Sequence, residues 1–296
     1  MHSDDTVKVL RRASALAGVN SDGAEVIRLA ENAIYRLPGG VVARIAKKGQ
    51  SAAAAKEVNV ARWLEESGVS AVRVLRDLDQ PVQVEDRAVT FWQELPSHEY
   101  GTTADVAAAL RELHRLTPPA ILELPGLAPF VRVAQRIETA TTISVDDQNW
   151  LLDRLAKLKA AYDGLPPGLP RCVVHGDAWR GNVVTTADKI SVLLDLERCA
   201  LGPPEWDLVS TAVTYVTTAG IDINEWDNYC EVYGYDVTTW EGFDILRDIR
   251  ELRQTTMAVQ VAATNPERYA DQAAHRLACL RGQRGPRPWS GWWAVP

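Results

Sequence analysis

The most restrictive feature of this sequence is the segment VVHGDAWRGNVV at residues 173–184. An apolar, strand-like run stops at His175, passes through seven polar or small residues, and resumes after Asn182. A turn that only reversed the chain could be shorter and would need no carboxylate and amide five positions apart. We therefore interpret the segment as a rigid loop that holds the side chains of Asp177 and Asn182 near one point.

The composition argues against several classes of partner. The chain is 46% hydrophobic and 24% charged, as is typical of globular proteins, and its net charge of −7 disfavours nucleic acid. No apolar run approaches the roughly 20 residues that span a bilayer, so no membrane partner is expected. The N-terminal segment MHSDDTVKVLRRAS lacks the apolar core of a signal peptide, and the four cysteines lack framework spacing. These features predict a cytoplasmic protein with reduced thiols.

The first third of the chain predicts a small, mostly antiparallel sheet with helices. A helical pattern covers residues 4–17, and an Ala- and Glu-rich helix covers 51–68. The runs AEVIRLA, IYRL, VVARIA, AVRVL, PVQVE and AVTFWQEL have the length and composition of strands. We expect these elements to form an amino-terminal lobe over residues 1–95.

The remainder of the chain predicts a helical lobe over residues 96–296. Helical patterns cover residues 102–116 and 146–163, and three more lie between 205 and 282. Short strands, RCVVHG and NVVTT, frame the loop at 173–184, and ISVLLDLE follows as a third. The joint between the lobes is expected at residues 92–97, where Pro96 ends a strand. The predicted fold class is α+β.

The loop and the strand after it together indicate phosphoryl-transfer chemistry. If NVV and VLLD pair as a hairpin around residues 186–189, Asn182 and Asp195 come close together. An amide oxygen and a carboxylate are hard ligands that suit magnesium, usually beside phosphate oxygens. Asp177 is then available to accept a proton from an attacking hydroxyl group. A base, two magnesium ligands and two lobes fit a phosphoryl-transfer site.

HGDAWRGN followed by LLDLERCALGPPEWDLV resembles the signature of the aminoglycoside phosphotransferase and choline kinase superfamily. The family pattern is His-Gly-Asp, four residues, Asn, then an Ile-Asp-type motif. A Gly-x-Pro-x-x-Asp-Leu stretch ends it, matched here by Gly202, Pro204, Asp207 and Leu208. The resemblance covers about residues 25–210 and implies a two-lobed fold similar to that of protein kinases.

In the first lobe the resemblance implies a nucleotide site. Asn32 falls in the loop that covers the nucleotide, and Arg44 falls where a phosphate-binding lysine is expected. Glu57 falls at the ion-pairing glutamate of the following helix. The stretch from Gln93 to Leu95 corresponds to the hinge whose backbone meets the adenine. The resemblance thus implies ATP and magnesium as cofactors, with GTP as the alternative donor.

Two departures from the family pattern bear on this site. The nucleotide loop contains no glycine-rich run. An arginine replaces the lysine at Arg44; it supplies a fixed positive charge, but its fork geometry differs from that of an ammonium group. Lys47 or Lys48 therefore stands as an alternative partner for Glu57.

Four residues near the loop have two interpretations each. His175 is interpreted as a structural loop residue rather than a base. Asp207 lies at a helix start and is interpreted as support for the loop, with substrate contact as the alternative. Glu197 either assists the metal or is solvated. Trp179 either forms a wall of the acceptor pocket or packs beneath the loop.

The sequence therefore predicts a phosphotransferase that moves a phosphoryl group from ATP to a hydroxyl of a small molecule. The acceptor classes left open are an aminoglycoside or other antibiotic, an amino alcohol such as choline or homoserine, and a sugar. Two alternatives differ in class: a nucleotide-binding pseudoenzyme, and a metal-dependent hydrolase that uses Asp177, Asn182 and Asp195 directly. The sequence contains no signal for oligomeric state.

Overall fold

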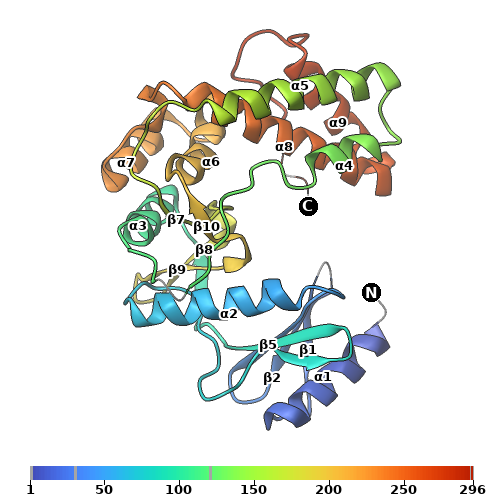
Figure 1. Ribbon diagram of the computed structural model, residues 1–296, viewed down its shortest axis with the longest axis vertical. Helices are drawn as coiled ribbons and strands as arrows, with labels where there is room; N and C mark the ends of the chain where they lie inside the picture. The colour runs from blue at the N-terminus through green and yellow to red at the C-terminus, as the bar shows by residue number, and fades with distance from the viewer. Residues whose placement is uncertain (1–2, 30–31, 120–121, 294, 296) are drawn as a thin grey trace. The chain divides into compact units, whose positions relative to one another are not determined.

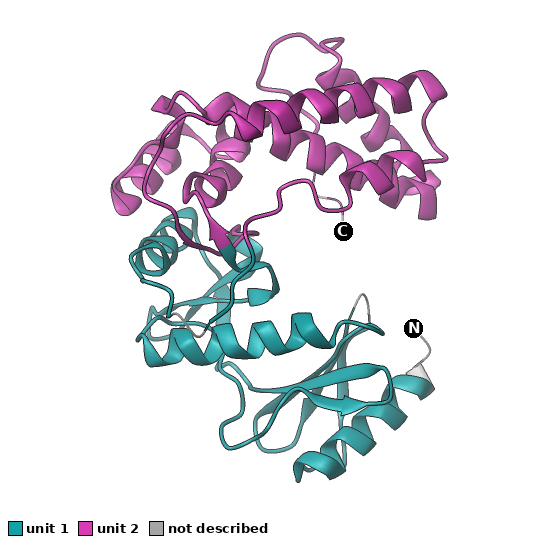
Figure 2. Cartoon of the chain, viewed as in Figure 1, with its two compact units in different colours: residues 1–125, 180–200 teal, residues 126–179, 201–296 magenta. Residues whose placement is uncertain are grey.

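The computed structural model describes residues 3–29, 32–119, 122–293 and 295. The chain divides into two compact units (Figure 2). Unit 1 contains residues 1–125 and 180–200, and unit 2 contains residues 126–179 and 201–296. Each unit therefore combines segments that are distant in the sequence. The lobe boundary at residues 92–97 stays a prediction.

Unit 1 contains an antiparallel sheet, as the strand patterns predicted, and its strand order is β1-β2-β3-β5-β4. Its strands are β1 (Glu25–Leu29), β2 (Ala33–Leu37), β3 (Val41–Ile45), β4 (Val82–Val84) and β5 (Arg87–Gln93). The strand predicted at AVRVL is wrong, because only isolated bridges form there, at Ala71 and Val74. Ala71 pairs with one strand and Val74 with another, so this segment builds no continuous ladder.

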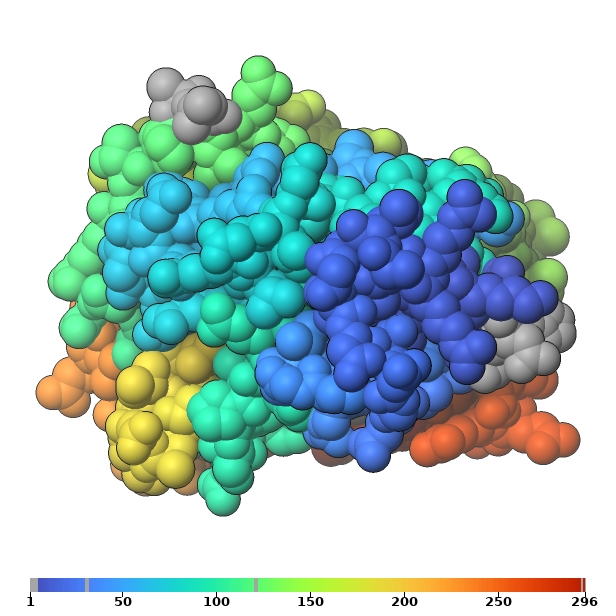
Figure 3. Space-filling view, turned by 90° about the horizontal axis from the view of Figure 1, so that it is seen from below, coloured from blue at the N-terminus to red at the C-terminus, as the bar shows by residue number. Residues whose placement is uncertain are grey.

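Two helices cover opposite faces of this sheet, α1 (Ser3–Ala17) and α2 (Ser51–Glu66) (Figure 1). The α1 side chains of Leu10 and Ala13 pack with Ala43 and Phe91 in one core cluster. Figure 3 is seen from below Figure 1 and shows the dark-blue atoms of the N-terminal segment, which contains α1, toward the viewer. Successive strand residues point to opposite faces, so Arg44, which follows Ala43, faces α2.

Unit 1 also contains the hairpin that the sequence predicted. Strand β8 (Val183–Thr186) pairs antiparallel with β9 (Ser191–Leu193), and β6 (His98–Tyr100) completes a three-stranded sheet. The short helix η1 (Arg180–Asn182) precedes the hairpin and η2 (Leu196–Arg198) follows it. Helix α3 (Thr103–His114) begins at Thr102, whose side chain accepts a hydrogen bond from the Asp105 N–H in a capping box.

Unit 2 is mostly helical. Its helices are α4 (Val133–Glu138), α5 (Val145–Asp163), α6 (Glu205–Val216), α7 (Ile223–Tyr233), α8 (Phe243–Thr264) and α9 (Pro266–Leu280), with η3 at Val237–Thr239. The strands β7 (Cys172–Val174) and β10 (Ala200–Gly202) form a two-stranded sheet. The three helical patterns predicted over 205–282 are four α-helices in the structure. Asn265 caps α9 and Pro266 starts it, which separates α9 from α8.

Within the described ranges, none of the helices combines the length and the apolar character needed to cross a membrane.

Candidate active site

A partly buried ion pair between Arg44 and Glu57 lies at the centre of the candidate site in unit 1. Arg44 extends from β3, and its Nη1 donates to both carboxylate oxygens of Glu57, at 2.5 and 2.6 Å. Glu57 lies on α2, the helix that follows β3. The partner of Glu57 is thus Arg44 rather than Lys47 or Lys48. A lysine on this strand paired with a glutamate on the following helix is the arrangement that positions nucleotide phosphates in protein kinases, and Arg44 takes the place of that lysine here.

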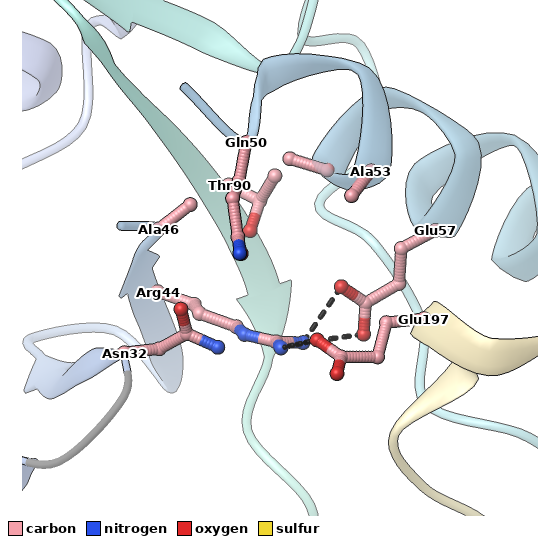
Figure 4. A pocket seen from close by; sticks show the side chains of 9 residues that line it. Asn32, Arg44, Ala46, Gln50, Ala53, Glu57, Thr90 and Glu197 are labelled. Carbon is pink, nitrogen blue, oxygen red and sulfur yellow. Dashed lines mark hydrogen bonds and ion pairs between the residues drawn. The ribbon is translucent and has the colours of Figure 1, made fainter. Parts of the chain in front are cut away.

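Further oxygen atoms surround the same guanidinium (Figure 4). Nη2 of Arg44 donates to Oε2 of Glu197 at 2.7 Å and lies 3.9 Å from Oδ1 of Asp195. With its amide oxygen turned toward Arg44, Asn32 accepts from Nη2 at 2.7 Å and from Nε at 3.0 Å. Burial disfavours the charged guanidinium, but these carboxylates outweigh that effect and raise the pKa of Arg44. Arg44 therefore stays charged.

A pocket opens beside this cluster. Thr90 contributes to its lining because alternation on β5 places this residue on the same face of the sheet as Arg44. The complete lining is Asn32, Arg44, Ala46, Gln50, Ala53, Ala54, Glu57, Thr90 and Glu197. The sequence prediction missed Gln50 and Thr90, although the alternation on β5 could have indicated Thr90.

The ionisation of Glu57 reflects its burial. Removal from water raises the pKa of Glu57 to about 7, because the attraction of Arg44 is opposed by burial and by the nearby carboxylates of Asp195 and Glu197. The site thus brings three carboxylates around one guanidinium. Such an excess of negative charge favours a cation nearby and opposes an isolated anion.

This raised pKa predicts a pH-dependent stability. The folded chain binds the Glu57 proton more tightly than the unfolded chain, so the stability contributed by Glu57 falls as pH rises from 4.5 toward about 7. The fall is at most about 3 kcal/mol. Urea unfolding of wild type and Glu57→Gln should show a stability difference, wild type minus variant, that decreases across this window. A difference that increases with pH would mean that Arg44 lowers the pKa of Glu57 instead.

The two predicted magnesium ligands flank the β8–β9 hairpin. The carbonyl oxygen of Asn182 accepts a hydrogen bond from the N–H of Leu194 at 2.9 Å, which places the backbones of Asn182 and Asp195 beside one another. Asp195 has a φ of 53°, a left-handed conformation that is strained for most residues and tolerated by Asp. Its carboxylate and the amide oxygen of Asn182 are the hard donors that magnesium takes. The donor chemistry therefore fits a magnesium ion.

The predicted hinge is partly engaged in backbone pairing. The N–H of Gln93, at the end of β5, donates to the carbonyl oxygen of Arg73 at 2.8 Å. The N–H of Glu94 donates to the carbonyl oxygen of Gly40, also at 2.8 Å. Leu95 follows the end of the strand. The backbone N–H groups of Gln93 and Glu94 already donate to other backbone carbonyl oxygens, so an adenine at this segment would have to bind other groups.

In unit 2, Asp207 holds the first half of the loop. Its carboxylate accepts hydrogen bonds from the backbone N–H of His175 at 2.6 Å and of Gly176 at 2.9 Å. Both His175 and Asp207 are fully buried. Gly176 has a φ of +83°, which favours glycine and turns the chain toward Asp177. Two charge-assisted bonds from a helix start thus fix the backbone just before Asp177.

An arginine that the sequence prediction did not include lies near Asp177. Nη1 of Arg250, on α8, is 3.9 Å from Oδ1 of Asp177. The Arg250 guanidinium stacks on the ring of Trp206 at 4.1 Å and donates to the Trp206 carbonyl oxygen. Trp206 in turn donates from Nε1 to the carbonyl oxygen of Gly176. No local pattern indicates Arg250, because only the packing of α8 on α6 brings it to the loop.

Asp177 and Trp179 follow the turn at Gly176, and their side chains differ in exposure to solvent. The carboxylate of Asp177 is about one third exposed, at 35%, and the Trp179 side chain is 53% exposed. Trp179 is therefore not packed beneath the loop, which leaves the interpretation that it contacts an acceptor as a prediction.

The contacts of Asp207 predict a large loss of stability on its removal. Asp207→Ala leaves two buried N–H groups without this acceptor, which costs about 2–5 kcal/mol. The free energy of unfolding in urea measures this loss. Asp222→Ala in the same unit is a matched control, because Asp222 caps α7 by accepting from a single exposed N–H, that of Glu225. The control should cost about 1 kcal/mol. Equal losses in both variants would contradict a special role of Asp207 in holding the loop.

The sequence model of the phosphotransferase enzyme family matches residues 25–246, most of the chain. The chain belongs to this family. The match includes the β3–α2 ion pair, the loop around Asp177 and the hairpin that carries Asp195, so the predicted superfamily is confirmed. No curated protein sequence shows significant similarity to this phosphotransferase-family chain.

Solved structures share its fold. A choline/ethanolamine kinase family protein from Mesorhizobium loti is 19% identical, with 94% of each chain covered and a TM-score of 0.65. Amicoumacin kinase, solved with AMP-PNP and Ca2+, is 13% identical over 96% of each chain, with a TM-score of 0.73. An aminoglycoside phosphotransferase from Streptomyces rimosus is 19% identical over 85% of this chain and 99% of its own, with a TM-score of 0.59. The predicted α+β, kinase-like fold class is confirmed.

Proposed function

We propose that this member of the phosphotransferase enzyme family transfers the γ-phosphoryl group of ATP to a hydroxyl of a small molecule, with magnesium. The observation that carries the proposal is the bidentate bond between Arg44 on β3 and Glu57 on α2, beside a pocket. In kinases this pair positions the phosphates of the donor. The binding of AMP-PNP and Ca2+ by the structurally similar amicoumacin kinase supports a nucleotide and a divalent cation here.

The predicted metal ligands and the predicted base have distinct roles in this proposal. Asn182 and Asp195 would hold magnesium, which neutralises charge on the phosphates when bound. Asp177 would accept the proton of the acceptor hydroxyl and orient its oxygen. Arg250 would help to orient the Asp177 carboxylate, because its buried guanidinium lies 3.9 Å from that group. Most of the rate would come from positioning and charge neutralisation.

The acidic side chains of α8 bear on the class of acceptor. Glu251 is fully buried. Its carboxylate accepts two hydrogen bonds from Arg287, and Asp248 accepts from the same arginine. Arg247 forms ion pairs with both Asp244 and Asp248, and Arg154 forms one with Asp248. Because arginines balance these carboxylates, the acidic residues of α8 give no preference for a cationic acceptor.

The test is phosphoryl transfer from labelled ATP, with GTP in parallel, to a panel of acceptors. The panel contains aminoglycosides, other hydroxylated antibiotics, amino alcohols such as choline and homoserine, and sugars. A labelled product from one acceptor class that requires magnesium would establish the activity and name the acceptor.

Two other results would change the conclusion. Release of labelled phosphate at the same rate with and without acceptors would favour a metal-dependent hydrolase. Magnesium-dependent ATP binding without transfer or hydrolysis, over the whole panel, would favour a nucleotide-binding pseudoenzyme.

A further inference from the structure

All three nitrogen atoms of the Arg44 guanidinium donate hydrogen bonds within unit 1. A guanidinium group carries five N–H donors, one on Nε and two on each terminal nitrogen. Nη1 donates to both carboxylate oxygens of Glu57, and Nη2 donates to Glu197 and to Asn32. The Nε donor also bonds to Asn32. A phosphate oxygen that binds Nη2 of Arg44 must therefore compete with the acceptors already there.

The three acceptors differ in how easily a phosphate can replace them. Glu57 is bonded through both oxygens and its side chain is only 5% exposed, so its release would strand a carboxylate in a buried position. Glu197 is bonded through one oxygen and its side chain is 31% exposed. Its carboxylate can regain water on release. Asn32 is neutral, and its replacement would leave the charge of Glu197 beside the phosphate. Glu197 is therefore the acceptor that a phosphate replaces at least cost.

We propose that the Glu197 carboxylate occupies the phosphate-binding edge of Arg44, and that a nucleotide phosphate must displace it. This inference rests on the proposed nucleotide site and adds a residue that sets its affinity. Glu197 weakens binding twice, because it competes for the Nη2 donor and repels the phosphate. The nearby cation Lys56 is bonded to the Cys199 carbonyl oxygen, at 3.1 Å, rather than to Glu197. The competition is strongest without a divalent cation, because no metal ion then offsets the negative charge of the carboxylates near the phosphate.

The arginine at position 44 makes this arrangement geometrically possible. Its fork lets Nη1 hold Glu57 while Nη2, on the other branch, bonds to Glu197. A phosphate can then exchange with Glu197 on Nη2 while the bond to Glu57 persists. The departure from the lysine of the family pattern is thus linked to the position of Glu197.

The test is a calorimetric titration of wild type, Glu197→Gln and a control with two ligands, each in EDTA. The ligands are ATP and inorganic tripolyphosphate, which has no adenine. The control is Glu65→Gln, because Glu65 lies on the same helix as Glu57 and forms an equivalent ion pair, with Arg76 at 2.5 Å, outside the pocket lining. Urea unfolding confirms that each variant is folded.

We expect Glu197→Gln to bind both metal-free ligands about tenfold more tightly than wild type, the effect of about 1.4 kcal/mol in binding free energy. Glu65→Gln should bind them like wild type. Equal or weaker binding by Glu197→Gln would overturn the proposal, as would an equal gain in the control. If Glu197→Gln fails to fold, Glu197→Asp supplies the test: its shorter side chain withdraws from Arg44 and should also tighten binding.

The two ligands separate this inference from the proposed function. If tripolyphosphate binds more tightly to Glu197→Gln but ATP with magnesium binds no variant, the nucleotide function fails and the competition for Arg44 stands. If ATP with magnesium binds wild type but the metal-free affinities do not respond to Glu197→Gln, the inference fails and the nucleotide function stands.

Discussion

Asp177→Asn is expected to lower kcat by about 10²- to 10⁴-fold, the usual contribution of a general base. An amide at this position keeps the size of the side chain but cannot accept the proton of the acceptor hydroxyl. The KM for ATP should remain within about twofold of wild type, since Arg44 and Glu57 lie in a different compact unit from Asp177. Steady-state kinetics with the acceptor found in the transfer panel measures both quantities.

The matched control for this variant is Asp188→Asn. Asp188 is an exposed residue in the turn between β8 and β9, so the substitution removes one negative charge without changing the loop at 173–184. The control should have the turnover of wild type. If Asp177→Asn retains near-wild-type turnover, Asp177 is not the base, and His175 is the next residue to test despite its burial.

Asp195→Asn is expected to lower kcat by about 10³-fold at the magnesium concentration that saturates wild type, because a bound metal supplies several kcal/mol of transition-state charge stabilisation. The variant should also need more magnesium for half-maximal activity. Asparagine is a suitable replacement because it tolerates the left-handed backbone that Asp195 adopts, with a φ of 53°. Activity across a magnesium titration measures both effects.

A second experiment separates metal binding from loss of structure. Direct titration of Mn²⁺ into the protein with ATP, followed by electron paramagnetic resonance, reports occupancy of the site without turnover. Asp195→Asn should bind the ion more weakly, whereas Asp188→Asn should bind it like wild type. A variant that binds Mn²⁺ normally but turns over slowly would assign Asp195 a role other than metal ligand.

The local parts of this fold could be predicted from the sequence. Apolar alternation predicted β3 and β5, and it also determines that Arg44 and Thr90 share a face of the sheet. Spacing around a short turn predicted the β8–β9 hairpin, which brings the backbones of Asn182 and Asp195 together. The composition of AVRVL predicted a strand, but Ala71 and Val74 form isolated bridges to two different strands, so that prediction was wrong.

The partners of the charged residues could not be predicted in the same way. The sequence suggested that Glu197 either assists a metal or is solvated, and neither interpretation included its bond to Arg44. Glu197 and Arg44 are 153 positions apart, so their contact depends on how η2 packs beside α2 and the sheet. The same holds for Arg250, which reaches the loop only because α8 packs on α6.

The sequence by itself determined the order and spacing of the motifs, the family that they indicate and the face of each strand, because side-chain periodicity is a property of a few consecutive residues. Only the tertiary structure decided which oxygen atoms occupy the donors of Arg44 and which cation lies near Asp177. Those contacts join elements that are distant along the chain, and packing, rather than local pattern, brings them within hydrogen-bonding range.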